Sequence, residues 1–227
     1  MCGIVALVGS REAAPQLLEG LRQLEYRGYD SAGLAVVDAT DEHLRCIRAR
    51  GKLANLTERV EREGAPGQCG IGHTRWATHG KPEERNAHPH LSGDAAVAVV
   101  QNGIIENHRS LREDLEATGV VFRSETDTEV IPHLIDAALQ VLVSDGGELG
   151  GPLLLEAVQQ VLPKLQGAYA IAVIWNRAPG ALVVARKAAP LLIGLGEGEF
   201  LCASDTPALA GFTRTILPME DGEVALL

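Results

Sequence analysis

The sequence predicts an α+β protein in which antiparallel sheets stack on one another and helices cover their outer faces. Many short runs of apolar and β-branched residues, bounded by glycine or polar residues, are typical of hairpin strands. Several other stretches repeat apolar residues at the spacing of amphipathic helices. The chain has 227 residues, of which 46% are hydrophobic and 22% charged, as in an ordinary globular domain. Sheets with two apolar faces need covering layers, so these observations together favour a layered α+β domain.

The first half of the chain begins with the strand-like run GIVALVG. In the helix expected next, Leu17, Leu18, Leu21 and Leu24 form one apolar stripe, and Gly28 is available to end it. The elements expected after this first strand are a helix at 14–28, strands at 31–39 and 43–51, a helix at 52–63, and strands at 67–78 and 95–103.

In the second half we expect helices at 107–117, 129–143 and 152–165, followed by strands or hairpins at 168–176, 181–189, 190–196, 199–205 and 214–227. Thr126 and Glu129 match a capping box, but a cap at Thr126 would place Pro132 beyond the first turn, where it is costly. A cap at Thr128 avoids this conflict. Asp127 would then lie just before the helix, with its carboxylate free to face a ligand.

Charge and cysteine content restrict the partners and the compartment. Thirty acidic and twenty basic residues leave a net charge of −10, which argues against a nucleic-acid partner and against an anionic membrane surface. No apolar run reaches the roughly 18 residues that span a bilayer, and no secretion signal is recognisable. The four cysteines lack the spacings of zinc or redox motifs. We therefore expect a cytoplasmic protein, with Cys46, Cys69 and Cys202 as structural thiols.

Cys2 directly follows the initiator methionine and precedes the first strand. Removal of Met1 would make it the first residue, with a thiol and a free amine on one residue. The alternative is a small apolar residue that starts a strand. Five polar segments punctuated by glycine or proline follow or interrupt the later strand-like runs, so we expect their side chains to converge at strand ends: LEYRGYDSAG (24–33), GHTRWATHG (72–80), NAHPH (86–90), QNGIIEN (101–107) and SETDTE (124–129).

Together with the leading Cys-Gly-Ile-Val, these motifs resemble the class II, N-terminal-nucleophile glutamine amidotransferases, and specifically the glutaminase domains of the glutamine–fructose-6-phosphate aminotransferases. The resemblance covers residues 1–227 and implies a four-layer αββα N-terminal-nucleophile hydrolase fold. The relatives that use phosphoribosyl pyrophosphate share Cys-Gly-Ile and Asn-Gly, but differ in the first two motifs. The resemblance further implies that L-glutamine is hydrolysed to L-glutamate and ammonia.

The chemistry explains the catalytic residues that the resemblance assigns, namely Cys2, Asn102 and Gly103. Amide hydrolysis needs a nucleophile, a base and donors for the developing oxyanion. A thiol and an α-amine have ordinary pKa values of about 8.5 and 8, so proton transfer between them is nearly balanced. The resemblance implies a γ-glutamyl thioester on Cys2, with the side chain of Asn102 and the backbone of Gly103 as oxyanion donors. Alternatively, Asn102 and Gly103 form a hairpin turn.

Glutamine carries an α-carboxylate and an α-ammonium group, which a selective pocket should pair. Arg75 suits the carboxylate because its planar guanidinium binds in a bidentate manner, and Asp127 suits the ammonium. By resemblance, Thr78 and His79 add hydrogen bonds on the carboxylate side. The alternative for Arg75 is a surface ion pair.

The resemblance also implies that Trp76 is a movable plug between the glutamine site and an ammonia exit, and that Arg27 and His88 support the glutamine-binding loop. From the strand pattern alone, we expect Trp76 to be a half-buried aromatic residue within a strand. One position departs from the family, because Gln101 stands where a histidine commonly precedes Asn-Gly. Gln101 donates and accepts hydrogen bonds but cannot become a cation, which affects the expected pH profile.

No cofactor or metal is expected. His73, His79, His88 and His90 lie within eighteen residues but have no carboxylate or cysteine at a ligand spacing. GLGEGE at 194–199 leads into a strand instead of a helix, which indicates a hairpin turn and no nucleotide site.

The resemblance implies one partner, the sugar-phosphate isomerase domains of the full-length enzymes, which we expect to be absent from this chain. Two alternatives remain: the glutaminase domain of another class II enzyme, such as an amidophosphoribosyltransferase, or an inactive glutamine-binding regulatory module. A retained Met1 would favour the inactive module, because it would bury the amine of Cys2 in a peptide bond.

Overall fold

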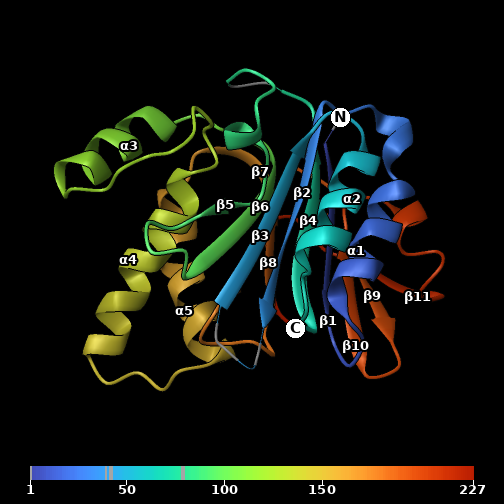
Figure 1. The fold of residues 1–227 in the computed structure, drawn as a ribbon. Coiled ribbons are helices and arrows are strands. Elements are labelled where there is room, and N and C mark those ends of the chain that lie inside the picture. The colour runs from blue at the N-terminus through green and yellow to red at the C-terminus, as the bar shows by residue number, and fades with distance from the viewer. Residues whose placement is uncertain (1, 39, 41–42, 78–79) are drawn as a thin grey trace.

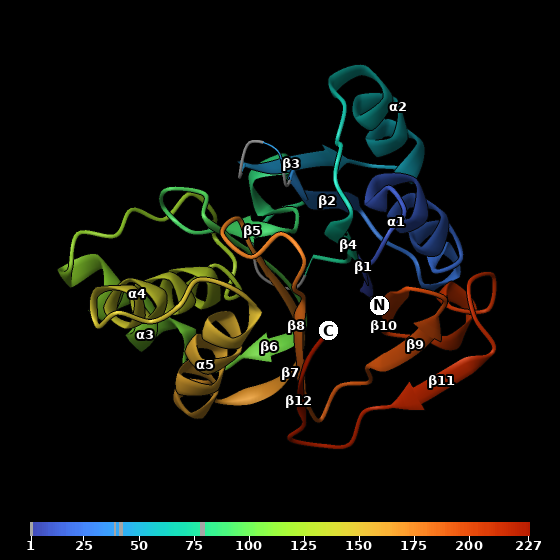
Figure 2. The ribbon, with the colours of Figure 1, turned by 90° about the horizontal axis from the view of Figure 1, so that it is seen from below.

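A computed structural model describes residues 2–38, 40, 43–77 and 80–227. Two antiparallel sheets pack face to face between two layers of helices (Figure 1). The view from below shows the helices α3, α4 and α5 on one side and α1 and α2 on the other (Figure 2). This arrangement confirms the predicted αββα layering and the α+β fold class.

The larger sheet has seven strands in the order β11-β9-β10-β1-β4-β2-β3. Its strands are β1 (Gly3–Val8), β2 (Ser31–Asp38), β3 (His43–Arg50), β4 (Cys69–Arg75), β9 (Leu192–Gly196), β10 (Glu199–Ala203) and β11 (Thr215–Pro218). The first strand therefore lies in the middle of the sheet, between β4 and β10. Because β1 is paired on both sides, this start of the chain is held rigidly.

The smaller sheet has five strands in the order β12-β8-β7-β6-β5. Its strands are β5 (His90–Leu91), β6 (Val97–Ile105), β7 (Gly167–Trp175), β8 (Val183–Lys187) and β12 (Val224–Leu226). The helices are α1 (Ala13–Arg22), α2 (Leu53–Glu63), α3 (His108–Ala117), α4 (Val130–Ser144) and α5 (Gly151–Val161).

Three apolar layers hold the molecule together. Leu17 and Leu21 of α1 pack on the outer face of the larger sheet. The inner faces of both sheets meet in a second layer of small and branched side chains, including Ile4 of β1 and Val100 of β6. In the third layer α4 and α5 cover the smaller sheet, with Ile135 at its centre. Burial of such side chains contributes about 1.5 to 3 kcal/mol each.

Several predicted boundaries need correction. The helix predicted at 14–28 ends at Arg22, and a separate 3₁₀ turn at Glu25–Arg27 completes the segment before Gly28. The short strand β5 was not predicted, because two residues carry too little pattern. The hairpin-turn alternative for Asn102 and Gly103 is wrong, since both residues lie inside β6.

The start of α4 also differs from the prediction. The helix begins at Val130, and its N-cap is Glu129 instead of Thr128. The Thr128 hydroxyl donates to the Oε1 atom of Gln101 at 2.7 Å, so a tertiary contact takes the group that would have capped the helix. Pro132 still falls in the first turn, where it is tolerated. Asp127 precedes the helix, as predicted.

Other expectations are confirmed within the described residues. Residues 194–199 span the turn of the hairpin that β9 and β10 form. Cys69 and Cys202 are buried free thiols, and Cys46 is a partly buried one. No helix in the described part of the chain combines the length and apolarity that a membrane crossing requires.

Candidate active site

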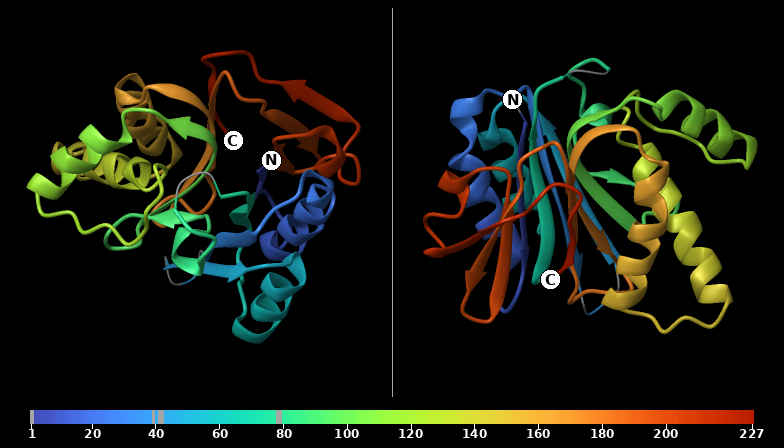
Figure 3. Two further views of the ribbon diagram at one scale, coloured as in Figure 1. Left: turned by 90° about the horizontal axis from the view of Figure 1, so that it is seen from above. Right: turned by 180° about the vertical axis from the view of Figure 1, so that it is seen from behind.

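The predicted site residues gather at one end of the layer between the sheets. Side chains alternate along a strand, so the inward row of β4, which contains Cys69 and Ile71, continues through His73 to Arg75. The inward row of β6 continues in the same way to Asn102. Gly3 pairs with Thr74, so Cys2 lies at the end of β4 beside Arg75. The views from above and behind show the N-terminus at this end of the sheets (Figure 3).

Cys2 is held from several sides. The backbone N–H of Trp76 donates to the Cys2 sulfur at 3.3 Å. The carbonyl oxygen of Cys2 accepts from Arg27 Nη1 at 3.1 Å and from Asn102 Nδ2 at 3.4 Å. Burial raises the pKa of the Cys2 thiol, while the Trp76 N–H and the Arg75 charge oppose that rise. The thiol is therefore neutral at rest and needs a base.

Arg27, a predicted supporting residue, ties Cys2 to the segment after β10. Its guanidinium also donates to Ser204 Oγ at 3.3 Å and to the Asp205 carboxylate at 2.6 Å. Ser204 Oγ in turn accepts the backbone N–H of Ile4 at 3.0 Å. These contacts fix the position of Cys2 before any substrate binds.

Gly103 has a backbone that only glycine adopts easily, with φ of 119°. A Cβ atom there would lie 2.0 Å from the carbonyl oxygen of Ala168 on the neighbouring strand. Gly103 lines the same small cavity as Cys2. The glycine therefore lets the β6 backbone run close to β7 at the candidate oxyanion site.

Arg75 and Asp127 bring opposite charges to this cavity. Arg75 is only 3% exposed, so the surface ion-pair alternative is wrong. Burial lowers the pKa of Arg75, and the charges of Asp30 and Asp127 oppose that shift. The carboxylate of Asp127 accepts the backbone N–H of Ile105 at 2.8 Å. Each charge is thus fixed by the protein and faces the space beside Cys2.

Trp76 follows the last residue of β4 and is 55% exposed. It lies over Gly28, where an added Cβ would be 3.4 Å from the indole ring. It also lines the cavity, and the strand-aromatic alternative is wrong because Trp76 lies beyond β4. Thr78 and His79, the two predicted contacts on the carboxylate side, lie outside the described residues.

Gln101 and His88 also line this cavity, and they contact each other. The backbone N–H of Gln101 donates to His88 Nδ1 at 3.3 Å, and Gln101 Oε1 accepts from Thr128. In the part of the chain that the structure describes, the buried Nε2 atom of Gln101 has no hydrogen-bond partner. Gln101 therefore accepts the hydrogen bond of Thr128 with an amide oxygen, which, unlike a histidine nitrogen, does not gain a proton near neutral pH.

Three buried histidines lie together beside these residues. The rings of His73 and His88 stack at 4.2 Å, and His90 meets His88 edge-on at 4.7 Å. Burial lowers the pKa of His73 and of His90 to about 3, and that of His88 well below its usual value. All three are neutral near pH 7. Within the described ranges, no three His, Cys, Asp or Glu side chains are grouped as metal ligands.

Three further residues at the site were not singled out from the sequence. Asp30 accepts the backbone N–H of Ala77 at 2.6 Å, which anchors the segment after Trp76. Thr126 and Thr128 line the cavity on either side of Asp127. Asp30 lies within the motif at 24–33, at the start of β2, so an acidic residue at a strand end was the available signal. The two threonines lie within the polar segment at 124–129, but the sequence pattern favoured a helix-capping role for them.

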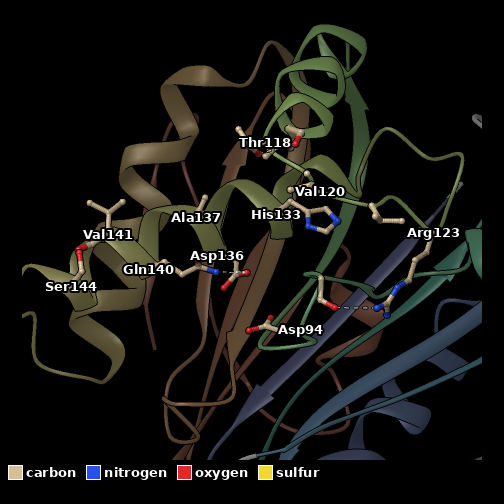
Figure 4. Close-up of a pocket in the computed structure, with 14 residues that line it drawn as sticks. Asp94, Thr118, Val120, Arg123, His133, Asp136, Ala137, Gln140, Val141 and Ser144 are labelled. Atoms are coloured by element: carbon tan, nitrogen blue, oxygen red, sulfur yellow. Dashed lines mark hydrogen bonds between the residues drawn. The ribbon is translucent and has the colours of Figure 1, made fainter.

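The cavity beside Cys2 measures about 20 Å³, whereas a cleft of about 820 Å³ lies elsewhere (Figure 4). The large cleft runs along α4 and contains Asp94, Arg123, His133 and Asp136. Burial and the neighbouring charge of Asp94 raise the pKa of Asp136 to about 6. None of the predicted site residues lines this cleft, so the chemistry points to the smaller cavity.

Comparisons with known proteins identify the family of the chain. Residues 73–211 match the glutamine amidotransferase domain family. The chain is 58% identical over all 227 residues to the isomerizing glutamine–fructose-6-phosphate aminotransferase of Thermosynechococcus vestitus and 56% identical to that of Nostoc sp.. It spans 35% of the length of each.

A similar solved structure is the glutamine phosphoribosylpyrophosphate amidotransferase of B. subtilis, with a TM-score of 0.81 and 29% identity. The match covers 99% of this chain and 47% of that one. The chain thus combines two stacked antiparallel sheets between helices with a cysteine at the start of a central strand. Its sequence is also similar to these enzymes along its whole length. The chain belongs to the glutamine amidotransferase domain family.

Proposed function

We propose that this chain hydrolyses L-glutamine to L-glutamate and ammonia through a thioester on Cys2. The observation that carries the proposal is that Cys2, Arg75, Gly103 and Asp127 line one cavity. Selective hydrolysis of the glutamine amide needs a nucleophile and an oxyanion donor. It also needs two opposite charges that bind the α-carboxylate and α-ammonium groups.

The reaction uses the thiol and the α-amine that removal of Met1 frees on Cys2. The amine takes the thiol proton as sulfur attacks the carboxamide carbon, and the amide oxygen becomes an oxyanion. The Asn102 amide and the Gly103 N–H stabilise that charge. The protonated amine then gives its proton to the leaving nitrogen, which departs as ammonia. Water, deprotonated by the amine, adds to the thioester, and glutamate leaves as the sulfur recovers its proton.

Substrate recognition depends on two fixed charges. The Arg75 guanidinium pairs with the α-carboxylate of glutamine, and the Asp127 carboxylate pairs with the α-ammonium. Thr78 and His79 add hydrogen bonds on the carboxylate side, by similarity to the family. A cavity of about 20 Å³ holds about one water molecule, so the residues that line it move apart when glutamine enters. Trp76, half exposed at its rim, is the group that we assign to this movement and to the ammonia exit.

The acceptor of ammonia belongs to a longer protein. The relatives in which this domain occupies 35% of the length are named for fructose 6-phosphate, which supports delivery of ammonia to that sugar by a partner isomerase domain. Residues 1–227 then form one glutaminase domain. Phosphoribosyl pyrophosphate is the second candidate for the ammonia acceptor, because the identity to the enzyme named for it is lower. Free thiols and the absence of paired cysteine motifs support a cytoplasmic location.

Cys2→Ala tests the proposal most directly. We expect the purified chain to release glutamate from glutamine and the variant to release none, because the variant lacks the thiol that lines the cavity. A diazoketone analogue of glutamine should label the chain on Cys2, which peptide mass spectrometry locates.

Cys46→Ala is the matched control, because it removes a partly buried thiol outside the site and should retain activity. Glutamate release by Cys2→Ala, or full activity in protein that still carries Met1, would refute the mechanism. A wild-type chain that binds glutamine but releases no glutamate would favour the inactive regulatory module.

A further inference from the structure

The side chain of Asn102 can stabilise an oxyanion only when its NH₂ group, and not its oxygen, faces Cys2. A primary amide is nearly symmetric in shape, so something else must select the orientation. Asn102 is only 9% exposed, and its two amide atoms contact different groups. Nδ2 lies 3.4 Å from the carbonyl oxygen of Cys2, and Oδ1 lies 3.0 Å from Nε2 of His73.

These two contacts are consistent with only one arrangement of hydrogens. The carbonyl oxygen of Cys2 can only accept, so the atom that faces it must be the amide nitrogen. The amide oxygen then faces His73 and can only accept, so His73 must carry its proton on Nε2. Among the described residues, no group makes a well-formed hydrogen bond with the buried Nδ1 atom of His73, which fits the unprotonated nitrogen of that tautomer.

The surroundings of His73 preserve this neutral form. The ring is completely buried and stacks on His88. Burial and the charge of Arg75 both lower the pKa of His73. A protonated ring would add a positive charge beside Arg75, while the neutral ring donates one directed hydrogen bond.

Resting on the proposed glutaminase activity, we propose that His73 is a positioning residue that orients the Asn102 amide as the oxyanion donor. His73 does not touch the substrate. It holds the amide oxygen away from the reacting carbonyl, and so presents Nδ2–H where negative charge develops. The hydrogen bond from Nδ2 to Cys2 is long, so this N–H can turn to the oxyanion at little cost.

Two substitutions at His73 separate the donor from the bulk of the ring. His73→Phe keeps a flat ring that can stack on His88 but removes the N–H donor. We expect kcat to fall by about ten- to a hundredfold with KM for glutamine within about threefold, because the loss concerns the oxyanion and not the bound ground state. His73→Gln places an amide N–H near the former Nε2 and should recover kcat to within about fivefold of the wild type. Unchanged kcat in the phenylalanine variant, or no recovery in the glutamine variant, would overturn the proposal.

A double-mutant cycle with Asn102→Ala provides a readout that a merely structural role would not produce. If His73 acts through Asn102, adding His73→Phe to Asn102→Ala lowers kcat by no more than about twofold. If the two losses multiply, His73 does not act through Asn102. Thermal unfolding of each variant shows whether it is folded at the assay temperature.

The tautomer can be observed without any assay of activity. Nitrogen-15 NMR of the histidine-labelled chain, with His73 assigned by its absence in His73→Gln, should show a protonated Nε2 and an unprotonated Nδ1 near pH 7. A proton on Nδ1 would overturn the proposal even if His73→Phe does not fold. An inactive wild-type chain with the expected tautomer would instead count against the proposed function while leaving the contact between His73 and Asn102 intact.

Discussion

At the scale of single residues, the site shows how charged groups are kept in place when they are buried. Arg75 and Asp127 are 3% and 4% exposed, and an isolated buried charge costs several kcal/mol. Asp127 offsets part of that cost with the Ile105 N–H, and Arg75 lies in the field of two carboxylates. In the proposed function, the charges of a bound amino acid would add to these contacts.

Replacing Arg75 with lysine tests whether the guanidinium shape matters beyond its charge. Lysine keeps the charge but cannot form the bidentate pair, so we expect the loss of about 1.5 to 3 kcal/mol of binding, which is roughly a ten- to hundredfold rise in KM for glutamine. The fall in kcat should be smaller, as steady-state kinetics would show. Arg85→Lys, at an exposed ion pair, is the control and should leave KM unchanged. An unchanged KM in Arg75→Lys would remove Arg75 from substrate binding.

At the scale of elements, strand alternation and loop contacts assemble the site. His73 and Arg75 project from the inward row of β4, and Asn102 projects from that of β6, so two strands from different sheets meet beside Cys2. The segment before α4 is held by Glu129, whose carboxylate accepts the backbone N–H groups of Arg123 and Ser124 at 2.7 and 2.6 Å. The helix and its preceding loop thereby place Asp127 at the cavity.

The stack of His73, His88 and His90 predicts how stability depends on pH. Their pKa values in the folded chain lie far below the usual 6.5, so between pH 6.5 and about 5 the unfolded chain binds protons that the folded chain does not. The contribution of these neutral rings to the free energy of unfolding is therefore complete above pH 6.5. It falls as the pH is lowered, by up to about 1.4 kcal/mol per pH unit for each histidine.

Urea unfolding measured at several pH values within this window checks the prediction. His73→Gln should reduce the slope by the contribution of about one proton. Asp136 acts in the opposite direction by at most about one proton, because burial raises its pKa to about 6 in the folded chain, so the three histidines still dominate the slope. A free energy of unfolding that does not change between pH 6.5 and 5 would contradict the assignment of neutral buried rings.

At the scale of the whole molecule, segments that are far apart in the sequence meet beside Cys2. Ser204 of the segment after β10 accepts the N–H of Ile4 and receives a hydrogen bond from Arg27, across about two hundred residues of sequence. Its own N–H donates to the Ile4 carbonyl oxygen at 3.1 Å. The position of Cys2 therefore depends on folding of the entire larger sheet.

Ser204→Ala should show this dependence. The variant leaves the Ile4 N–H buried without a side-chain acceptor, which costs about 1 to 3 kcal/mol of stability. Glutaminase kcat should fall as well, because Arg27 loses one of the contacts that hold it against Cys2. Ser144→Ala, at an exposed helix end, is the control and should change the free energy of unfolding by less than about 0.5 kcal/mol. Stability and kcat both equal to the wild type would show that Ser204 does not fix the N-terminus.

The sequence by itself determined the elements and the chemistry. Apolar periodicity is a local property, so the order of nearly all strands and helices was readable, and the motifs around Cys2, Arg75 and Asn102 named the reaction class. Boundaries set by distant contacts were not readable: Thr128 does not cap α4 because Gln101 takes its hydroxyl hydrogen.

Only the tertiary structure placed one of the described histidines, His73, beside Asn102, the proposed oxyanion donor. His73 differs from His88 and His90 by its 3.0 Å contact with Asn102 on the other sheet. Such a contact depends on how two sheets face each other and at what register, and no pattern within either strand carries that information. Local sequence selects the elements, and long-range packing selects which of their side chains meet.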